Sequence, residues 1–292
     1  PAYNRWPLIC EAIGSALAQS YPAIEIVVVD DASTDGTAEQ VTRKYGTRVK
    51  LLVNGQNREK SCSRNTGIEA ATAPYMCMLD SDDVLLPEGI ADRLRIFQAE
   101  PAFAGVAYGA TWRGEGDVPP QAPGLPGGDI LDAYLGDYGL LDNNCFMIRT
   151  ADMRRHGMYN PGLTNLEDRD LMIRLAAHFQ FRYCGTYTHR VRRTSGSAQT
   201  NYEKLIRQER ALSRGLESDP WMRERLGARL DEIAWMEGAE LLRALYKTRR
   251  YASYVEMFRS LSGKYPAQTA ASSRMRRRYR VARVLSLIMP AR

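Results

Sequence analysis

Residues 24–37 read IEIVVVDDASTDGT, a short run of β-branched side chains that ends in acidic and hydroxyl groups. Such a run is typical of a buried strand, and the polar residues mark the edge of the sheet where the strand stops. A second run of this kind, YMCML at residues 75–79, is followed by DSDD at residues 80–83. Two buried strands that both end in carboxylates predict a ligand site at one edge of an α/β sheet.

Helical and extended patterns alternate around these strands. A third short apolar run predicts a strand at residues 49–53, and helical spacing of apolar residues fills the intervals. This alternation predicts a mainly parallel sheet with helices on both faces. The predicted helices cover residues 7–19, 36–45, 63–72 and 87–99.

The pattern is less regular from residue 100 to residue 200. It predicts a strand at residues 144–149, a helix at 166–179 and an extended segment at 187–193. Residues 114–128 (GEGDVPPQAPGLPGG) are rich in glycine and proline and predict a loop. A loop of this length either closes over a bound substrate or lies untethered on the surface.

Every segment after about residue 202 is helical in pattern. We therefore predict two domains, an α/β domain at residues 1–200 and an α-helical region at residues 201–292. Residues 201–292 contain 20 Lys and Arg against 10 Asp and Glu, whereas residues 1–200 contain 20 against 24. A basic region suits an anionic surface and an acidic domain suits a metal ion, although exposed helices also carry arginine without such a role.

The composition excludes several classes of protein. With 292 residues and 44% hydrophobic side chains, the chain can bury a sizeable core, which argues against a disordered or fibrous protein. The five cysteines are scattered without a C-x-x-C pair, which disfavours a zinc ribbon and favours a reduced, cytoplasmic compartment. No apolar run approaches the roughly 20 residues that span a bilayer.

The acidic clusters favour a bound cation. Asp80, Asp82 and Asp83 lie within four residues, and carboxylates so close together repel one another unless a cation lies between them. Mn²⁺ and Mg²⁺ prefer oxygen ligands and often bind together with substrate phosphates. Acids that are simply solvated in a turn are the alternative.

The sequence contains no Walker A or G-x-G-x-x-G motif. Phosphates would therefore be held mainly by a metal ion and by basic side chains. Arg64 is a candidate because it opens a predicted helix, whose N-terminus also attracts anions. A surface salt bridge is the alternative reading of Arg64.

Taken in order, these motifs resemble those of family 2 glycosyltransferases, which have the GT-A (Rossmann-like) fold. The resemblance implies that residues 1–200 are a catalytic domain. It also implies transfer of a sugar, with inversion, from a nucleotide-diphosphate donor, foremost a UDP-sugar, to a glycan or lipid-linked acceptor in cell-surface glycan synthesis. The matching pieces are Pro1-Ala2-Tyr3-Asn4, Val29-Asp30-Asp31-Ala32-Ser33-Thr34-Asp35-Gly36-Thr37, Arg64-Asn65-Thr66-Gly67, Leu79-Asp80-Ser81-Asp82-Asp83 and Leu166-Glu167-Asp168.

The resemblance also implies roles for single residues. Tyr3 and Asp31 would hold the nucleotide base and ribose. Of the D-x-D region, Asp80 would contact the donor, whereas Asp82 and Asp83 would bind Mn²⁺ or Mg²⁺, which bridges to the diphosphate.

Three further residues receive roles from the resemblance. Asp168 would be the general base, with Glu167 beside it on the substrate side, and His189 would be a donor-side or metal-side group. Asp168 has a structural alternative, since an N-cap at Asn165 would make it a third helical residue that is favoured by the cap and the helix dipole. His189 is equally compatible with a purely structural role.

Two features depart from the family pattern. Relatives have an apolar strand just before the Pro-x-Tyr-Asn turn, whereas this sequence starts at Pro1, so we expect the record to be truncated at that strand. The Gln-x-x-Arg-Trp signature of processive relatives is absent, which disfavours a polymerising synthase. Two other classes stay open: a nucleotidyltransferase that makes the sugar donor, and a non-catalytic carbohydrate-binding or membrane-binding module.

The end of the sequence suggests a membrane partner. The cluster RMRRRYR at residues 274–280 is followed by the mostly apolar run VARVLSLIM at residues 281–289. A basic helix with an apolar end predicts contact with an anionic membrane surface, here the inner face of the cell membrane. Alternatively, Val284, Leu285 and Ile288 dock on the protein while the arginines are solvated. Nucleic acid is disfavoured because no recognition fold accompanies the cluster.

Overall fold

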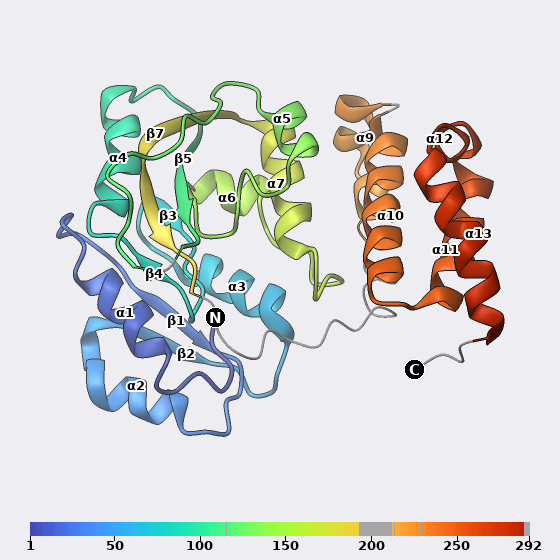
Figure 1. Cartoon of the computed structure of the whole chain (residues 1–292). Coiled ribbons are helices and arrows are strands. Elements are labelled where there is room, and N and C mark those ends of the chain that lie inside the picture. Colours follow the sequence, from blue (N-terminus) through green and yellow to red (C-terminus); the bar gives the residue numbers. More distant parts are fainter. Residues whose placement is uncertain (115, 193–211, 213, 228, 289–292) are drawn as a thin grey trace. The chain divides into compact units, whose positions relative to one another are not determined.

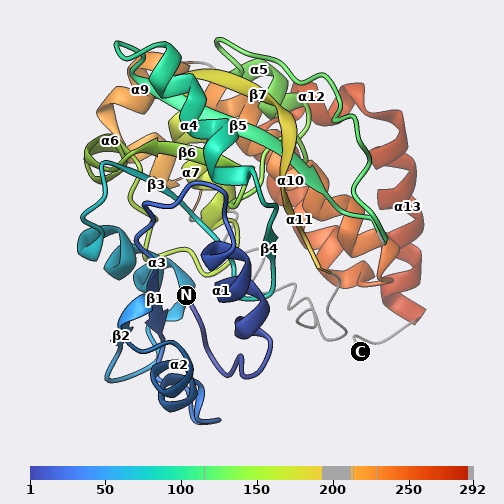
Figure 2. The ribbon, with the colours of Figure 1, turned by 90° about the vertical axis from the view of Figure 1, so that its left-hand side faces the viewer.

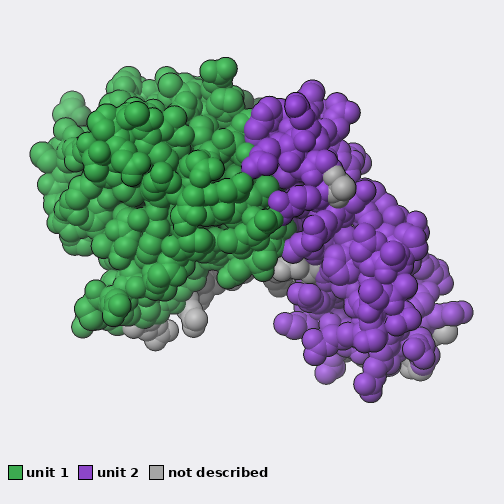
Figure 3. Space-filling view, turned by 90° about the horizontal axis from the view of Figure 1, so that it is seen from above, with its two compact units in different colours: residues 1–197 green, residues 198–292 purple. Residues whose placement is uncertain are grey.

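The computed structural model describes residues 1–114, 116–192, 212, 214–227 and 229–288 (Figure 1). The chain divides into two compact units, Pro1–Ser197 and Ala198–Arg292 (Figure 3). The predicted boundary at residue 200 lies outside the described residues, as does the start of the helical pattern at about residue 202.

The first unit is an α/β structure whose first half follows the predicted alternation. The strand and helix that carry the first acidic motif form as expected, because the β-branched run is buried and the polar turn after it stops the strand. The elements up to residue 99 are α1 (Ile9–Leu17), β1 (Val27–Asp30), α2 (Thr37–Tyr45), the 3₁₀ turn η1 (Gly46–Arg48), β2 (Lys50–Val53), α3 (Glu59–Ala70), β3 (Tyr75–Cys77), β4 (Val84–Leu85) and α4 (Gly89–Ala99).

The second half of this unit contains elements that the sequence pattern did not predict. The most buried of them is the strand β5, in which six of eight residues are buried. Its Gly109 is required because a Cβ there would overlap the Thr188 side chain on the neighbouring strand. The elements that were not predicted are β5 (Gly105–Trp112), α5 (Leu131–Gly136) and α6 (Thr150–His156). The strand β6 (Phe146–Arg149) and the helix α7 (Glu167–His178) match predicted elements, and β7 (Gln180–Arg190) begins before the extended segment predicted at 187–193.

The strands form a parallel pair, β1-β2, and a five-stranded sheet in the order β3-β6-β5-β7-β4 (Figure 2). The α/β class with helices on both faces is confirmed, but the prediction of a mainly parallel sheet is wrong for the second sheet. Only β5 and β7 pair in parallel there, whereas β3-β6, β5-β6 and β4-β7 are antiparallel. The cause is the segment 113–145, which starts at the edge where β5 ends and returns to that same edge, so that β6 runs backwards.

The start of the chain lies beside β1. Ala2 N donates to Val29 O and Asp31 N donates to Ala2 O, both at 2.8 Å, which makes a parallel bridge at the carboxyl end of β1. A cavity of about 370 Å³, lined by residues of both β1 and β3, separates these two strands. The strand expected before Pro1 stays a prediction.

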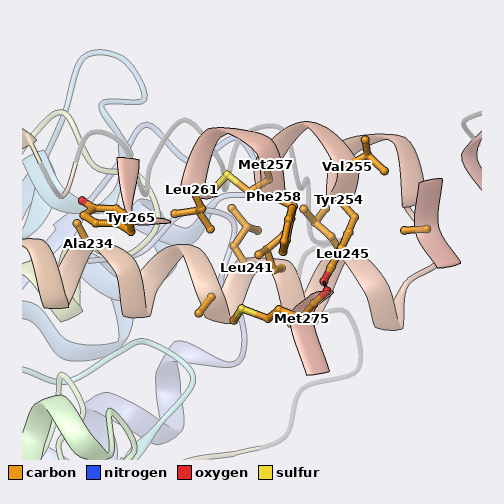
Figure 4. Close-up of a cluster of buried hydrophobic side chains, with 13 residues drawn as sticks. Ala234, Leu241, Leu245, Tyr254, Val255, Met257, Phe258, Leu261, Tyr265 and Met275 are labelled. Atoms are coloured by element: carbon orange, nitrogen blue, oxygen red, sulfur yellow. Dashed lines mark hydrogen bonds between the residues drawn. The ribbon is translucent and has the colours of Figure 1, made fainter. Parts of the chain in front are cut away.

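The second unit is α-helical, which confirms the predicted helical C-terminal region. Its helices pack around a core of their own that includes Leu241, Leu245, Tyr254, Phe258 and Met275 (Figure 4). The helices are α9 (Pro220–Leu226), α10 (Arg229–Lys247), α11 (Tyr251–Lys264), α12 (Pro266–Ala271) and α13 (Ser273–Ile288). Among the described residues, no helix has the length and apolar character needed to cross a bilayer.

Candidate active site

A cavity of about 350 Å³ lies where β1 ends and where the acidic turn follows β3. Five of the residues singled out from the sequence line it together, namely Tyr3, Asp31, Arg64, Asp80 and Asp82. They come from the start of the chain, from the β1 and β3 ends and from α3, so the cavity brings the predicted motifs together although β1 and β3 belong to different sheets. Its other lining residues are Pro1, Ala2, Arg5, Asn57, Glu59, Lys60 and Ser81.

Asp31 and Tyr3 are two of the lining residues. Asp31 is buried, and its Oδ1 accepts hydrogen bonds from Asn54 Nδ2 at 2.7 Å and from Arg58 N at 2.9 Å. Both donors bind the same oxygen, and no described residue donates to Oδ2. The Tyr3 side chain is exposed. The two residues therefore offer a fixed carboxylate and an aromatic ring to a ligand.

A buried charge network around Arg64 also reaches the cavity. Its guanidinium donates to Asp80 Oδ1 at 2.6 Å and to Glu167 Oε1 at 2.8 Å, and Lys60 Nζ lies 2.6 Å from the same Glu167 oxygen. The side chains of Arg64 and Glu167 are 5% and 1% exposed, so the surface salt-bridge reading of Arg64 is wrong. Burial alone would disfavour the charge of Asp80, but Arg64 outweighs it and holds the pKa of Asp80 below its usual value.

The three acids of the turn face different surroundings. Asp82 is partly exposed, and its Oδ2 lies 3.8 Å from an Arg5 nitrogen. Asp83 is buried and does not line the cavity. Its oxygens instead accept hydrogen bonds from Arg192 N at 3.0 Å and from Asn144 Nδ2 at 2.6 Å. Burial, with the nearby carboxylates of Asp80 and Asp82, raises the pKa of Asp83 to about 7.

Two residues that the sequence pattern did not single out, Asn143 and Asn144, hold this turn. Asn144 Oδ1 accepts a hydrogen bond from Asp80 N at 2.9 Å, while its amide nitrogen donates to Asp83. Asn143 Oδ1 accepts a short hydrogen bond from the buried hydroxyl of Tyr159. These asparagines precede β6, and because β6 is antiparallel to β3 they reach the carboxyl end of β3. A prediction that β6 runs antiparallel to β3 would have placed both asparagines at that end of β3.

We expect Asn144→Ala to lower transferase activity by roughly tenfold without abolishing the fold. The substitution removes the donor to Asp83 and the acceptor for Asp80 N, and a buried polar group left unpaired costs about 1–3 kcal/mol. The melting temperature and kcat/KM should both fall. Asn160→Ala is the control, since that side chain is bonded only within its own turn, to Gly162 N. Equal losses in the two variants would contradict a special role for Asn144.

His189 is fully buried on β7 and does not line the cavity. Its Nε2 lies 2.9 Å from Asp142 Oδ1, and the same carboxylate accepts hydrogen bonds from Thr111 and Arg113. The histidine is therefore partnered by protein. Among the described residues, no group of three or more His, Cys, Asp or Glu side chains is placed to hold a metal ion.

Asp168 is exposed in the first turn of α7. Leu166, not Asn165, is the N-cap residue, with a φ of 64° and no side-chain cap, so the expected cap at Asn165 is wrong. Asp168 becomes the second helical residue, and its Oδ1 accepts a hydrogen bond from Arg169 N at 2.8 Å. Its neighbour Glu167 points inward to Arg64. Asp168 is not among the cavity-lining residues.

The later part of the predicted loop at residues 114–128 is tethered. Tyr183 donates its hydroxyl to Pro123 O at 2.7 Å, and Gly128 exchanges two backbone hydrogen bonds of 2.8 Å with Phe181. Tyr108 also donates to Pro126 O through a short hydrogen bond. These contacts hold residues 123–128 against β5 and β7, and they contradict the reading of an untethered surface loop.

Known proteins with similar sequences include a polysaccharide biosynthesis protein and a glucosyltransferase. Over 108 residues the chain is 44% identical to the succinoglycan biosynthesis protein ExoO of Rhizobium meliloti. This alignment covers 36% of this chain and 30% of that protein. Over 102 residues the chain is 31% identical to WfaP of Escherichia coli, a UDP-Glc:alpha-D-GlcNAc-diphosphoundecaprenol beta-1,3-glucosyltransferase, covering 35% of this chain and 41% of that protein. The chain thus spans well under half the length of these relatives.

A similar solved structure supports the GT-A fold. A crystal structure of S. aureus TarS 1–349 in complex with UDP-GlcNAc has a TM-score of 0.70 and 19% identity, covering 99% of this chain and 87% of that one. At that identity the likeness concerns the fold alone. The family model described as glycosyl transferase family 2 matches residues 1–159, which is more than half of the 292 residues. The chain therefore belongs to glycosyltransferase family 2.

Proposed function

We propose that this chain is an inverting glycosyltransferase that moves a sugar from a UDP-sugar to an acceptor hydroxyl. The observation that carries the proposal is the 350 Å³ cavity, whose lining includes Tyr3 and Asp31 together with Arg64, Asp80 and Asp82. An aromatic ring and a carboxylate suit a nucleoside, and mixed charges beside them suit a diphosphate. The TarS structure with UDP-GlcNAc supports UDP as the nucleotide of the donor.

In this proposal the basic residues of the cavity hold the donor diphosphate. Lys60 is 43% exposed at its side chain and Arg5 is 40% exposed, so both can turn to an anion. Arg64 is fixed by Asp80 and Glu167, and it acts mainly by holding Asp80 in place. Positive charge beside the leaving diphosphate lowers the barrier because charge develops there in the transition state.

Mn²⁺ or Mg²⁺ fits Asp82 better than the other predicted ligands. Asp82 is partly exposed and contacts Arg5 only at 3.8 Å, whereas Asp83 and His189 already have protein partners. We propose Asp82 as the direct ligand, with Asp80 beside it, and Asp83 and His189 as supports of the turn. A divalent ion bound there with the diphosphate oxygens would neutralise the leaving group.

Asp168 is the proposed general base. The acceptor hydroxyl gives its proton to the Asp168 carboxylate while its oxygen attacks the anomeric carbon, and the bond from that carbon to the diphosphate oxygen breaks. The nucleoside diphosphate leaves with the bonding electron pair, so that a single displacement inverts the anomeric centre. Glu167 keeps the start of α7 in place through Arg64 and Lys60.

The acceptor is proposed from the relatives alone. ExoO is named for succinoglycan biosynthesis, and the name of WfaP gives a sugar linked to diphosphoundecaprenol. We propose a glycan or lipid-linked acceptor of cell-surface polysaccharide synthesis, met at the cytoplasmic face of the membrane. The five free cysteines accord with a reducing compartment.

A panel of nucleotide sugars tests this function. A donor that binds only the native state must raise the melting temperature, and we expect a UDP-sugar to do so with Mn²⁺ and to be slowly hydrolysed to UDP. Pyrophosphate release from a nucleoside triphosphate and a sugar phosphate would instead indicate a nucleotidyltransferase. Binding of glycans without any turnover would indicate a non-catalytic module.

Asp82→Ala tests the metal assignment. We expect it to remove the stimulation by Mn²⁺ and to weaken UDP-sugar binding by at least about tenfold, because one carboxylate ligand is lost. The measurement is UDP release against Mn²⁺ concentration. Glu39→Ala, an exposed acid on α2, is the control and should keep the response of the unmodified chain. Full Mn²⁺ stimulation in Asp82→Ala would rule out Asp82 as the ligand.

A further inference from the structure

One face of α13 combines exposed arginines with exposed valines. The opposite side of the helix is fixed against the core of the second unit, where Met275 and Ala282 are buried and the Tyr279 ring stacks on Phe258 at 4.3 Å. The outward side is therefore defined. We call it the arginine–valine face, and it consists of Arg274, Arg276, Arg277, Arg280, Val281, Arg283 and Val284, all of them exposed.

The charge of this face is not balanced locally. Residues 241–292 contain 13 Lys and Arg and one acidic residue, Glu256, and α13 itself contains no acid. Within the described part of the chain, none of the five exposed arginines is in an ion pair. An ordinary solvated helix is stabilised by pairs of opposite charge three or four residues apart, and α13 has none of them.

The two valines distinguish this face from a face that carries positive charge alone. Val281 and Val284 are 40% and 57% exposed, one helical turn apart, with arginines on both sides. Val284 therefore does not dock on the protein, contrary to the structural alternative drawn from the sequence, while Leu285 is half-buried. Residue 289 and the side chains of 287 and 288 lie outside the described residues.

We infer that the arginine–valine face binds the surface of an anionic phospholipid membrane, with α13 lying in the plane of the interface. Arginines are attracted to anionic headgroups, each one strengthening binding by about fivefold near such a surface. The valines can enter the boundary between headgroups and acyl chains, as apolar residues of interfacial helices do. The inference concerns a lipid partner and does not depend on the proposed transferase activity.

Charge reversal on the full chain tests it. Truncation before α13 would remove Met275, Tyr279 and Ala282 from the core, so exposed side chains are changed instead. The test variant is Arg276→Glu/Arg280→Glu/Arg283→Glu. The matched control, Arg43→Glu/Arg48→Glu/Arg155→Glu, makes the same change of net charge at exposed positions of the first unit. Co-sedimentation is measured with vesicles of phosphatidylcholine alone and with vesicles that also contain 30% phosphatidylglycerol. The salt concentration is about 0.1 M, at which charges are screened beyond about 10 Å.

We expect the unmodified chain to bind the anionic vesicles and not the neutral ones. The α13 triple variant should bind at least about 100-fold more weakly, while the control stays within about threefold. Val281→Ser/Val284→Ser should lose about tenfold, because the apolar contribution is removed. Circular dichroism and the melting temperature check that each variant is folded.

Three results would overturn the inference. Equal losses in the two triple variants would mean that only net charge matters, and absence of binding by the unmodified chain would exclude a membrane role for this face. Binding to duplex DNA that exceeds binding to anionic vesicles, and that is lost in the α13 variant, would assign the face to nucleic acid. None of these results bears on sugar transfer, because no donor or acceptor is present.

Discussion

Asp168→Asn is expected to retain donor binding and to lose sugar transfer by about 10²–10⁴-fold, the usual range for removal of a general base. The amide has nearly the shape of the carboxylate and can still accept the hydrogen bond from Arg169 N, but it cannot take a proton from the acceptor. Donor binding should persist because Asp168 does not line the cavity of Tyr3, Asp31 and Asp82. The measurement is kcat for transfer beside the Kd for the UDP-sugar.

Asp152→Asn is the matched control for this prediction. Asp152 is also an acid in the first turn of a short helix, α6, in the same unit. If carboxylates at helix starts matter only through the helix dipole, both variants lose about 0.3–1 kcal/mol of stability and neither loses activity. A loss of transfer below tenfold in Asp168→Asn, or an equal loss in the two variants, would return Asp168 to a structural role.

Local patterns predicted the first half of the first unit well. The run at residues 24–29 is apolar and β-branched, and the DDASTD turn after it cannot stay in a buried strand, so β1 and α2 follow from the sequence alone. The acidic turn after β3 was placed at the correct sheet edge for the same reason. Tyr3, Asp31, Arg64, Asp80 and Asp82 therefore meet in one cavity, as the motifs indicated.

Contacts between distant segments were not predictable from such patterns. β5 contains Gly105 and Gly109, which mask its extended character, although Gly109 is needed for close approach to Thr188. The antiparallel entry of β6 depends on where a 33-residue connection ends, and no local pattern encodes that. As a result the roles of Asn144 and of Asp142 beside His189 were missed, because both depend on that strand direction.

The sequence also could not show which charged side chains are buried. Arg64, Glu167 and Lys60 are separated by up to about 100 residues, and only the packing of α3 against the start of α7 joins them. A sequence pattern predicts which residues are charged, but the cost or benefit of a charge depends on how far water is excluded from it. The largest expected effect on stability follows from this network.

Arg64→Leu is expected to destabilise the first unit by about 3–5 kcal/mol near neutral pH, because the buried Glu167 loses one of its two cationic partners and the partly buried Asp80 loses its ion pair. The Glu167 side chain is 1% exposed and keeps only Lys60 as its partner. Arg95→Leu is the control, since Arg95 also pairs with two carboxylates, Glu88 and Asp92, but its side chain is 64% exposed. The pair with the exposed Glu88 is a surface pair worth about 0–1 kcal/mol, and although Asp92 is buried it keeps the hydrogen bond from the Thr186 hydroxyl.

The pH dependence separates lost charge pairing from lost packing. Arg64 holds the pKa of Asp80 below its usual value, so this pair stabilises the folded protein above the pKa of an unfolded aspartate, and the stabilisation is lost as pH falls through the lower folded pKa. In Arg64→Leu, the buried carboxylates are instead penalised when ionised, and that penalty disappears once they are protonated. The difference in unfolding free energy between the unmodified chain and Arg64→Leu should therefore be largest near pH 7, shrink as the carboxylates of the variant are protonated, and fall further below about pH 4, where Asp80 of the unmodified chain is protonated. Urea unfolding at several pH values measures it, and a difference that stays constant with pH would show that Arg64 contributes by packing rather than by charge.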